Sequence, residues 1–453
     1  MGETSNAVLD PRAEEARLKG LAGDILDEAA RQGADGAEVG ISLDSGLSAS
    51  VRMGDVETVE FNRDQGLGIT VYLGKKKGSA STSDSSLQAI KDTVRAALDI
   101  ARYASEDPFS GLAERALMAD AAALPDLDLY HPWGIEAPEA IDLALQCEDA
   151  GRNYSKKIIN SDGASVSSHQ GARVYGNSHG FIGSYVSSRH SLSAVLIGMQ
   201  EEEMQRDYWY TVNRNASLLE NAVEVGKTAA ERTISRLGAR KVDTAEVPVL
   251  FSADMAAGLI SHFLGAISGG NLYRQASFLL DHLGQRIFPE WMRIHEQPLL
   301  QGMLGSASFD NDGLATYAKD FIKDGVLEHY ILSTYSARKL GMKSTANAGG
   351  VNNLFVESNA GGQAELLKQM GTGLLVTELM GQGVNTVTGD YSRGAAGFWV
   401  ENGVIQFPVS EVTIAGNLKD MYRDIVAVGN DVDPRSTIQT GSILLNKMKL
   451  AGA

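Results

Sequence analysis

The chain has 453 residues, more than one hydrophobic core usually supports, so two or more domains are expected. A net charge of −17 argues against binding to nucleic acid or to an anionic membrane surface, since both would repel the chain. The single cysteine, Cys147, cannot form an internal disulfide, and the polar N-terminus has no apolar signal region, so a cytoplasmic location is expected.

The first region, residues 1–105, is predicted to be a small α+β domain. Apolar residues at helical spacing predict a helix over Glu14–Gln32, and a second helix with a serine cap is expected over Ser85–Tyr103. Alternating apolar residues between the helices predict an antiparallel meander of short strands at 37–43, 47–53, 56–62, 67–73 and 78–82. Turns are expected at Asp44-Ser45-Gly46, Gly54-Asp55 and Gln65-Gly66.

The second region, residues 106–238, opens with a linker rich in proline and aspartate and is expected to pack with the first. Helices are predicted over Glu139–Tyr154 and Ala216–Leu237. Three β-like segments are expected between them, over Lys156–Met199, with breaks at Ser161-Asp162-Gly163 and Gly176-Asn177-Ser178.

The third region, residues 239–453, begins with a predicted strand, Val247–Phe251, and an apolar helix, Met255–Ser268. This helix is too short to span a bilayer and contains His262. Many short strands and glycines follow, which predicts a β-rich sandwich or barrel, with a tight hairpin at Glu401-Asn402-Gly403. The whole chain is therefore predicted to be α+β, with a mixed helix and antiparallel-sheet region followed by a β-rich C-terminal domain.

Two catalytic patterns occur, and each has a simpler structural interpretation. Gly176-Asn177-Ser178-His179-Gly180 fits GxSxG, but strand-like residues on both sides favour a β-turn over a nucleophile elbow. His295-Glu296 begins an HExx pattern, yet Pro298 would break the helix that presents a second metal ligand. Neither pattern is taken as an active site.

The run from Gly381 to Leu418, with VNTVTGDYSRGA and TIAGNL, resembles the TldD/PmbA family of cytoplasmic metallopeptidase proteins, on its PmbA (TldE) branch. The resemblance covers most of the chain from about Ala37 onward. It implies a heterodimer in which only the TldD-type chain carries zinc, although like-with-like pairs also occur. It further implies a peptidase for unfolded or small peptides, including leader peptides and labile antitoxins, with this chain as the partner subunit.

The resemblance also implies that the zinc site is missing here. The catalytic branch binds zinc through a helical HExxxH and a cysteine near the C-terminus. The matching positions in this chain are Ser261, His262 and Ala266, and Cys147 lies far upstream. A serine hydroxyl and an alanine methyl are not zinc ligands. We therefore expect no metal or other cofactor in this chain, zinc in the TldD-type partner, and no activity of this chain alone.

The segment from Gly389 to Gly394 is the densest cluster of side chains that could contact a ligand, and Asp390, Tyr391, Ser392 and Arg393 are the predicted substrate-binding residues. Arg393 could bind a carboxylate or backbone carbonyl groups. The structural alternative is that Asp390 and Arg393 form an ion pair that holds a tight, glycine-flanked turn. This alternative is favoured, because a short-range ion pair needs no ligand to explain it.

Two other functions remain open. The chain could be a metal-free hydrolase that uses His262 with Ser261, although a histidine on an apolar helix is more often a hydrogen-bonded core or interface residue. It could also be a non-catalytic peptide-binding or scaffold protein.

Overall fold

The structure, a computed structural model, describes residues 10–452, so the polar N-terminal stretch 1–9 lies outside the described residues. The described chain divides into two compact units. The first contains the chain up to residue 196 together with 207–230 and 301–316. The second contains 197–206, 231–300 and the chain from 317 onward. Each unit is built around its own hydrophobic core.

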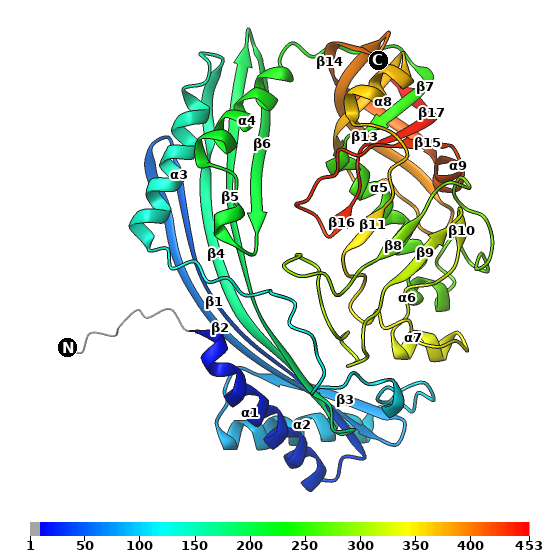
Figure 1. Cartoon of the computed structure of the whole chain (residues 1–453). Helices are drawn as coiled ribbons and strands as arrows, with labels where there is room; N and C mark the ends of the chain where they lie inside the picture. Colours follow the sequence, from blue (N-terminus) through cyan, green and yellow to red (C-terminus); the bar gives the residue numbers. More distant parts are fainter. Residues whose placement is uncertain (1–9, 453) are drawn as a thin grey trace. The chain divides into compact units, whose positions relative to one another are not determined.

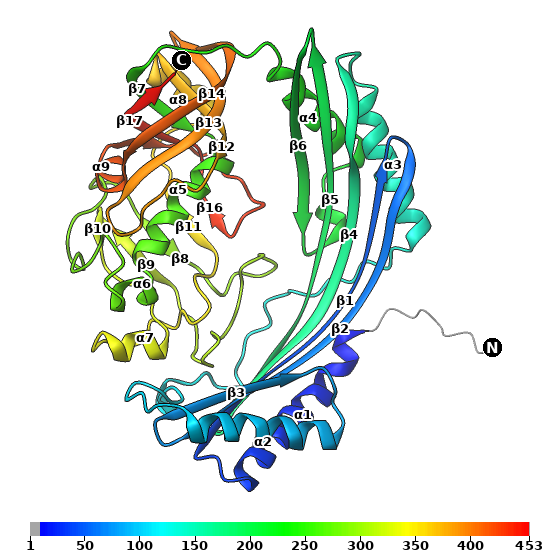
Figure 2. The same ribbon diagram turned by 180° about the vertical axis from the view of Figure 1, so that it is seen from behind.

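A six-stranded antiparallel sheet with the order β3-β2-β1-β4-β5-β6 dominates the first part of the chain. Figures 1 and 2 show α1 and α2 against one end of this sheet and α3 against the other. The helices and strands of this part are α1 Pro11–Arg31, β1 Gly36–Arg52, β2 Asp55–Leu73, β3 Lys76–Thr82, α2 Leu87–Tyr103, η1 Arg115–Leu117, α3 Ala137–Arg152, β4 Ile158–Asn177, β5 Ile182–Gln200, β6 Glu203–Asn213, η2 Ala216–Leu218 and α4 Ala222–Ser235.

The predicted meander of five short strands is wrong, because the strands are fewer and the first two are much longer. Residues 36–82 form three strands, and the turns expected at Asp44-Ser45-Gly46 and Gln65-Gly66 lie inside β1 and β2. Gly46 has a different role, because a Cβ there would lie 2.1 Å from Nδ1 of His169, its cross-strand partner on β4. The break expected at residues 161–163 likewise lies inside β4. Gly46 in the long strand β1 thus marks a close cross-strand approach and not a turn.

Local sequence explains the helix starts. Asp10 caps α1 with Pro11 at its first position, and Ser86 caps α2, as the predicted serine cap requires. The helix predicted over Ala216–Leu237 is interrupted, because Asn221 bonds the amide of Val223 and starts α4 only after the short η2. The predicted helices at the other positions are present within a few residues.

The later part of the chain is rich in β-strands, as predicted. Its elements are β7 Ala245–Phe251, α5 Ala253–Ala266, α6 Gly269–Tyr273, β8 Ile294–Glu296, β9 Lys319–Lys323, β10 Val326–Leu327, α7 Thr334–Lys339, β11 Leu354–Val356, α8 Gln363–Met370, β12 Gly373–Met380, β13 Asp390–Glu401, β14 Val404–Asn417, α9 Leu418–Arg423, β15 Ile425–Val428, β16 Ile438–Gln439 and β17 Ile443–Ala451.

Strands β14, β13, β12, β7 and β17 form a closed barrel, because β17 pairs with both β7 and β14. The predicted hairpin between β13 and β14 is confirmed, with Asn402 and Gly403 both at positive φ, 52° and 74°. A separate five-stranded sheet has the order β10-β9-β8-β11-β16. The predicted α+β class with a β-rich C-terminal part is therefore confirmed.

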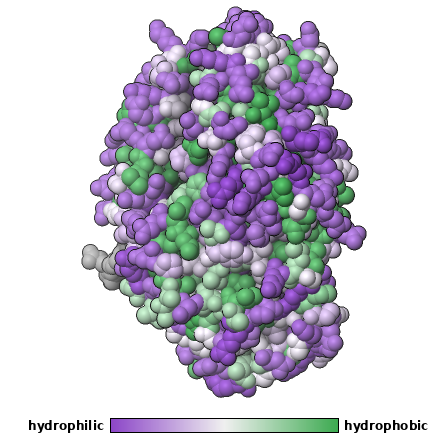
Figure 3. Space-filling model, turned by 45° about the vertical axis from the view of Figure 1, so that its right-hand side comes forward, coloured by the Kyte–Doolittle hydropathy of each residue, from purple (hydrophilic) through white to green (hydrophobic). Residues whose placement is uncertain are grey.

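Hydrophilic residues predominate on the face seen in Figure 3, and hydrophobic residues form small scattered patches there. Within residues 10–452, no helix is both long and apolar enough to cross a membrane.

Candidate functional site

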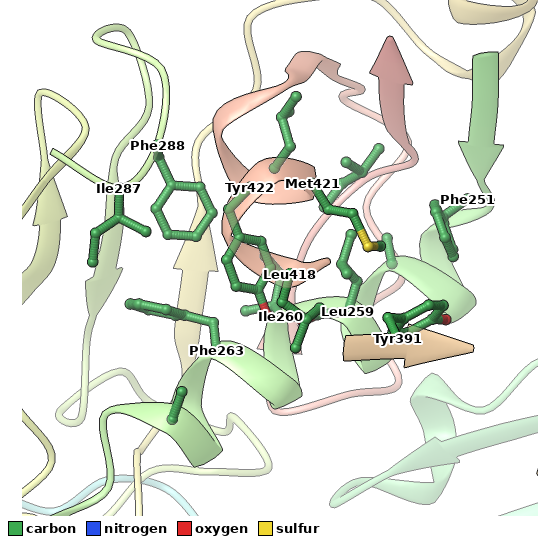
Figure 4. Close-up of a cluster of buried hydrophobic side chains, with 14 of the residues drawn as sticks. Phe251, Leu259, Ile260, Phe263, Ile287, Phe288, Tyr391, Leu418, Met421 and Tyr422 are labelled. Atoms are coloured by element: carbon green, nitrogen blue, oxygen red, sulfur yellow. Dashed lines mark hydrogen bonds between the residues drawn. The ribbon is translucent and has the colours of Figure 1, made fainter. Parts of the chain in front are cut away.

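Helix α5 and strand β13 bring the candidate residues of the second unit together. The buried residues of α5 recur at helical spacing, at Ala256, Leu259, Ile260, Phe263 and Ala266, and pack into the core of this unit. Figure 4 shows Tyr391 of β13 beside Leu259 and Ile260 of this helix. The predicted site residues His262 and Tyr391 are therefore close neighbours, although they lie far apart in the sequence.

The three positions that correspond to the family's metal motif do not form a donor set. Ser261 is exposed, whereas Ala266 is fully buried. The described part of the chain, residues 10–452, contains no group of three His, Cys, Asp or Glu side chains placed to hold a metal ion. The residues present therefore do not fit zinc.

His262 lies edge-on to Tyr391, with 6.0 Å between ring centroids and 74° between the ring planes. Its Nε2 atom is buried and has no hydrogen-bond partner. Burial, and then the charge of Arg393, lower the pKa of His262 below the ordinary value of 6.5. The imidazole is therefore neutral at pH 7. The interpretation of His262 as a packed histidine agrees with its contact to Tyr391. The hydrogen bond that was expected with it is missing at Nε2.

Side chains of β13 alternate between two environments, as expected for a strand. Tyr391 is only 2% exposed, and Arg393 is partly buried on the same face. Asp390 and Ser392 are exposed on the other face. Burial raises the pKa of Tyr391 to about 12, although the nearby charge of Arg393 and its hydrogen bond with Tyr391 lower it in part. The Nε atom of Arg393 is buried without a partner.

The structural alternative for this segment is wrong. Residues 390–401 form a strand, and Asp390 and Arg393 point to opposite faces of it, so they do not pair. Asp390 instead accepts hydrogen bonds from Thr388 Oγ1 at 2.7 Å and Asn417 Nδ2 at 3.2 Å. These bonds lower the pKa of Asp390. The turn lies just before the strand, at residues 385–389. There the Oδ1 atom of Asn385 accepts hydrogen bonds from the amides of Val387 and Thr388.

The two characteristic sequence runs meet in the barrel. Asp390 pairs with Asn417 across β13 and β14, and Tyr391 pairs with Gly416. Asn417 also donates to the carbonyl of Thr388 and caps α9. The residues VNTVTGDYSRGA and TIAGNL thus form one continuous structural element. Sequence reasoning missed the roles of Asn385 and Asn417, although their place inside the two runs was an available signal.

The two discarded catalytic patterns are structural. Ser178 lies in the tight turn between β4 and β5, and its Oγ accepts a hydrogen bond from the amide of Ala37 at 3.0 Å. The predicted β-turn is therefore confirmed. Glu296 lies on β8, is fully buried, and accepts a hydrogen bond from Lys319 Nζ at 2.6 Å and two from Asn347 Nδ2 at 3.0 and 3.1 Å.

Comparisons with known proteins cover nearly the whole chain. The descriptions "PmbA/TldA metallopeptidase domain 1", "central domain" and "C-terminal domain" match residues 37–101, 130–237 and 244–452. Metalloprotease PmbA of Escherichia coli O157:H7 is 54% identical over 92% of both chains. A solved structure from Bacteroides thetaiotaomicron is 28% identical, with a TM-score of 0.92 over 97% of this chain and 100% of that one.

The crystal structure of TldE from Thermococcus kodakarensis has the same fold, with a TM-score of 0.80 at 19% identity over 95% of this chain and 100% of that chain. The shared sequence runs, the barrel and the family matches agree with one another. The chain belongs to the PmbA/TldD family of metallopeptidases.

Proposed function

We propose that this chain is the metal-free partner subunit of a cytoplasmic TldD/TldE-type peptidase complex, in which a TldD-type subunit carries the zinc. The complex hydrolyses unfolded or small peptides, such as leader peptides and labile antitoxins. Support for this proposal comes from membership of the PmbA/TldD family and from a relative whose name is metalloprotease PmbA. The cytoplasmic location is supported by the single, buried cysteine.

The observation that carries the proposal is that α5 lacks a set of zinc ligands at the three positions of the motif. An exposed hydroxyl, a neutral imidazole with its Nε2 atom buried, and a methyl group occupy the positions where a metal ligand set would be needed. Zinc binding requires several deprotonated N, S or O ligands at about 2.0–2.3 Å, and this helix does not provide them. Metal-assisted hydrolysis must therefore be supplied by another chain.

Peptide contacts are proposed to come from β13. Asp390 and Ser392 occupy its exposed face, while Arg393 is partly buried beside Tyr391. Tyr391 is too deeply buried to contact a peptide and instead packs against α5. In the complex, Ser392→Glu is expected to raise KM for an acidic peptide several-fold and leave kcat nearly unchanged. Gln406→Glu, at another exposed position on β14, is the matched control and is expected to have no effect on KM.

The test is to produce this chain and the HExxxH-bearing relative from the same organism, each alone and together, and to measure zinc content and peptide cleavage. We expect zinc in the relative, none in this chain, and cleavage from the complex. Cleavage by this chain alone with chelator present, lost on His262→Ala, would establish the metal-free hydrolase instead. Stable binding of a different partner, with no binding of the relative, would establish the scaffold function.

A further inference from the structure

A cavity lies within the first unit, on the face of the six-stranded sheet that α1 and α2 leave open. Its volume is about 470 Å³, within the range of about 300–1,000 Å³ that is usual for small-molecule sites. Residues of β1, β2, β3 and β4 and of the loop 311–312 line it. Helices α1 and α2 pack on the other face of these strands (Figure 2). The candidate residues on α5 and β13 belong to the second unit, so this cavity is a different site.

Two glycines form the floor of the cavity. Gly40 on β1 and Gly68 on β2 are cross-strand partners, and a Cβ at either one would meet no other heavy atom of the described chain within 4 Å. Unlike Gly46, these glycines are therefore not required by a close approach of another strand. Glycine weakens a strand interior, and it often marks a place where a ligand approaches the backbone. The missing side chains leave a hollow at this point of the sheet.

Hydrogen-bond acceptors stand beside this floor. Glu38 lies two residues before Gly40 and so on the same face of β1, and Tyr175 of β4 is the cross-strand partner of Gly40. The carboxylate oxygens of Glu38 accept hydrogen bonds from Tyr72 Oη at 2.8 Å and from Tyr175 Oη at 3.0 Å. Because the phenol of Tyr175 gives its single proton to Glu38, it can only accept further hydrogen bonds.

A second carboxylate faces the same cavity from the loop. Asp312 lines the cavity, and its negative charge acts on both Glu38 and Tyr175. Burial raises the pKa of Glu38, the hydrogen bonds from the two tyrosines lower it in part, and the charge of Asp312 raises it further. A cation between the two carboxylates would offset both the burial of Glu38 and this repulsion.

The loop that carries Asp312 is held in position. The Oδ1 atom of Asp310 accepts hydrogen bonds from the amides of Asp312 at 3.0 Å and Leu314 at 2.9 Å. Gly313 has a φ of 80°, and a Cβ there would lie 2.8 Å from Cε1 of Tyr175. Glycine at this position therefore lets the loop pack against the tyrosine. A cavity that is already formed binds a ligand at a lower entropic cost than one that must be ordered.

We propose that this cavity binds the primary ammonium group of an aliphatic amine, which is either a free amine or a lysine side chain. The ammonium donates hydrogen bonds to the carboxylates of Glu38 and Asp312 and to Oη of Tyr175. Its methylene chain lies over Gly40 and Gly68. An ammonium has three diverging donors on one compact charge, which suits acceptors that come from three separate elements.

Other ligands fit this cavity less well. A planar guanidinium binds a carboxylate best through both oxygens at once, but both oxygens of Glu38 already accept a tyrosine proton. Calcium and magnesium take about six or more oxygen ligands, whereas within residues 10–452 no three His, Cys, Asp or Glu side chains are grouped to hold a metal ion. Anions are repelled by Glu38 and Asp312.

Isothermal titration calorimetry of the full chain tests the site with two probes, cadaverine and Nα-acetyl-lysine methylamide. We expect saturable binding of one molecule per chain. Glu38→Gln is expected to weaken this binding roughly 10- to 100-fold, because a hydrogen bond to a charged group is lost. Glu60→Gln, at an exposed carboxylate of the same sheet, is the matched control and is expected to have no effect. Binding of both probes assigns the cavity to lysine side chains as well as free amines, and binding of cadaverine alone assigns it to free amines.

A second variant, Gly68→Val, fills the cavity without changing its charge. The φ of Gly68 lies outside the left-handed region and the space above it is open, so this variant is expected to keep the circular dichroism and Tm of the parent but to lose amine binding. The absence of saturable amine binding in the parent would overturn the proposal. So would unchanged binding in Glu38→Gln and Gly68→Val, or tighter binding of Nα-acetyl-arginine methylamide than of the lysine probe. Neither a TldD-type subunit nor peptide cleavage enters this test, so its outcome is independent of the proposed function.

Discussion

The buried ion pair between Glu296 and Lys319 gives the sharpest test of whether the HE pattern is structural. Both side chains are almost completely buried, with side-chain exposures of 0% and 2%. Glu296 also accepts hydrogen bonds from Asn347 Nδ2 and the amide of Asn352. Replacing Lys319 by Met leaves a buried carboxylate without its cation. Breaking a buried pair in this way costs about 3–5 kcal/mol.

For a folded unit of roughly 200 residues, 1 kcal/mol shifts Tm by about 2–4 °C, so Lys319→Met is expected to lower the Tm of the second unit by roughly 6–20 °C. The double variant Glu296→Gln with Lys319→Met removes both charges and keeps the side-chain acceptor for Asn347. It is expected to recover most of the loss. Differential scanning fluorimetry and urea unfolding measure both variants.

Peptide cleavage by the variant complex distinguishes a structural role of Glu296 and Lys319 from a catalytic one. The double variant, where folded, is expected to support peptide cleavage by the complex at the parent rate, because Glu296 contacts no metal or substrate in this account. A Lys319→Met variant within 1 kcal/mol of the parent would refute the reasoning about burial. A stable double variant with abolished cleavage would refute the structural role of Glu296.

Three further outcomes follow from the described contacts. The pKa of His262 is lowered in the folded state, so the unfolded chain binds its proton more readily, and stability falls as the pH drops below about 6.5. The variant His262→Phe is expected to lose less stability than the parent between pH 7 and pH 5 in urea unfolding. Glu148→Ala is expected to lower the free energy of unfolding by about 1–3 kcal/mol, because the amides of Met53 and Gly54 lose a buried acceptor. Hydrogen exchange of these two amides is expected to become faster. Ser178→Ala is expected to leave cleavage by the complex unchanged, which a peptidase assay of the variant complex checks.

Local sequence signals predicted several elements well. Periodic apolar residues placed α5, and Asn402-Gly403 placed the hairpin of the barrel, because both depend on neighbours in the sequence. The same reasoning divided β1 and β2 into short strands. Serine, aspartate and glycine usually mark turns, but here Gly46 is needed for close approach of His169 from a strand far away in the sequence.

In the candidate site, residue types could likewise be read from the sequence, whereas the contacts between distant residues could not. The absence of donors at Ser261 and Ala266 could be read directly from residue types. The alternation of β13 decides that Asp390 and Arg393 cannot pair, and this required knowing that the segment is a strand. The neighbourhood of His262 and Tyr391 depends on how α5 packs against the barrel. Long-range packing of this kind leaves no pattern in a single sequence.

Zinc content of the purified chain tests the central claim most directly. The protein is expressed alone in zinc-supplemented medium, and its metal is quantified by inductively coupled plasma mass spectrometry beside the co-purified complex. The account predicts far less than one zinc per chain for this protein alone and about one zinc per heterodimer. One zinc per chain in the protein alone, lost on His262→Ala, would contradict it.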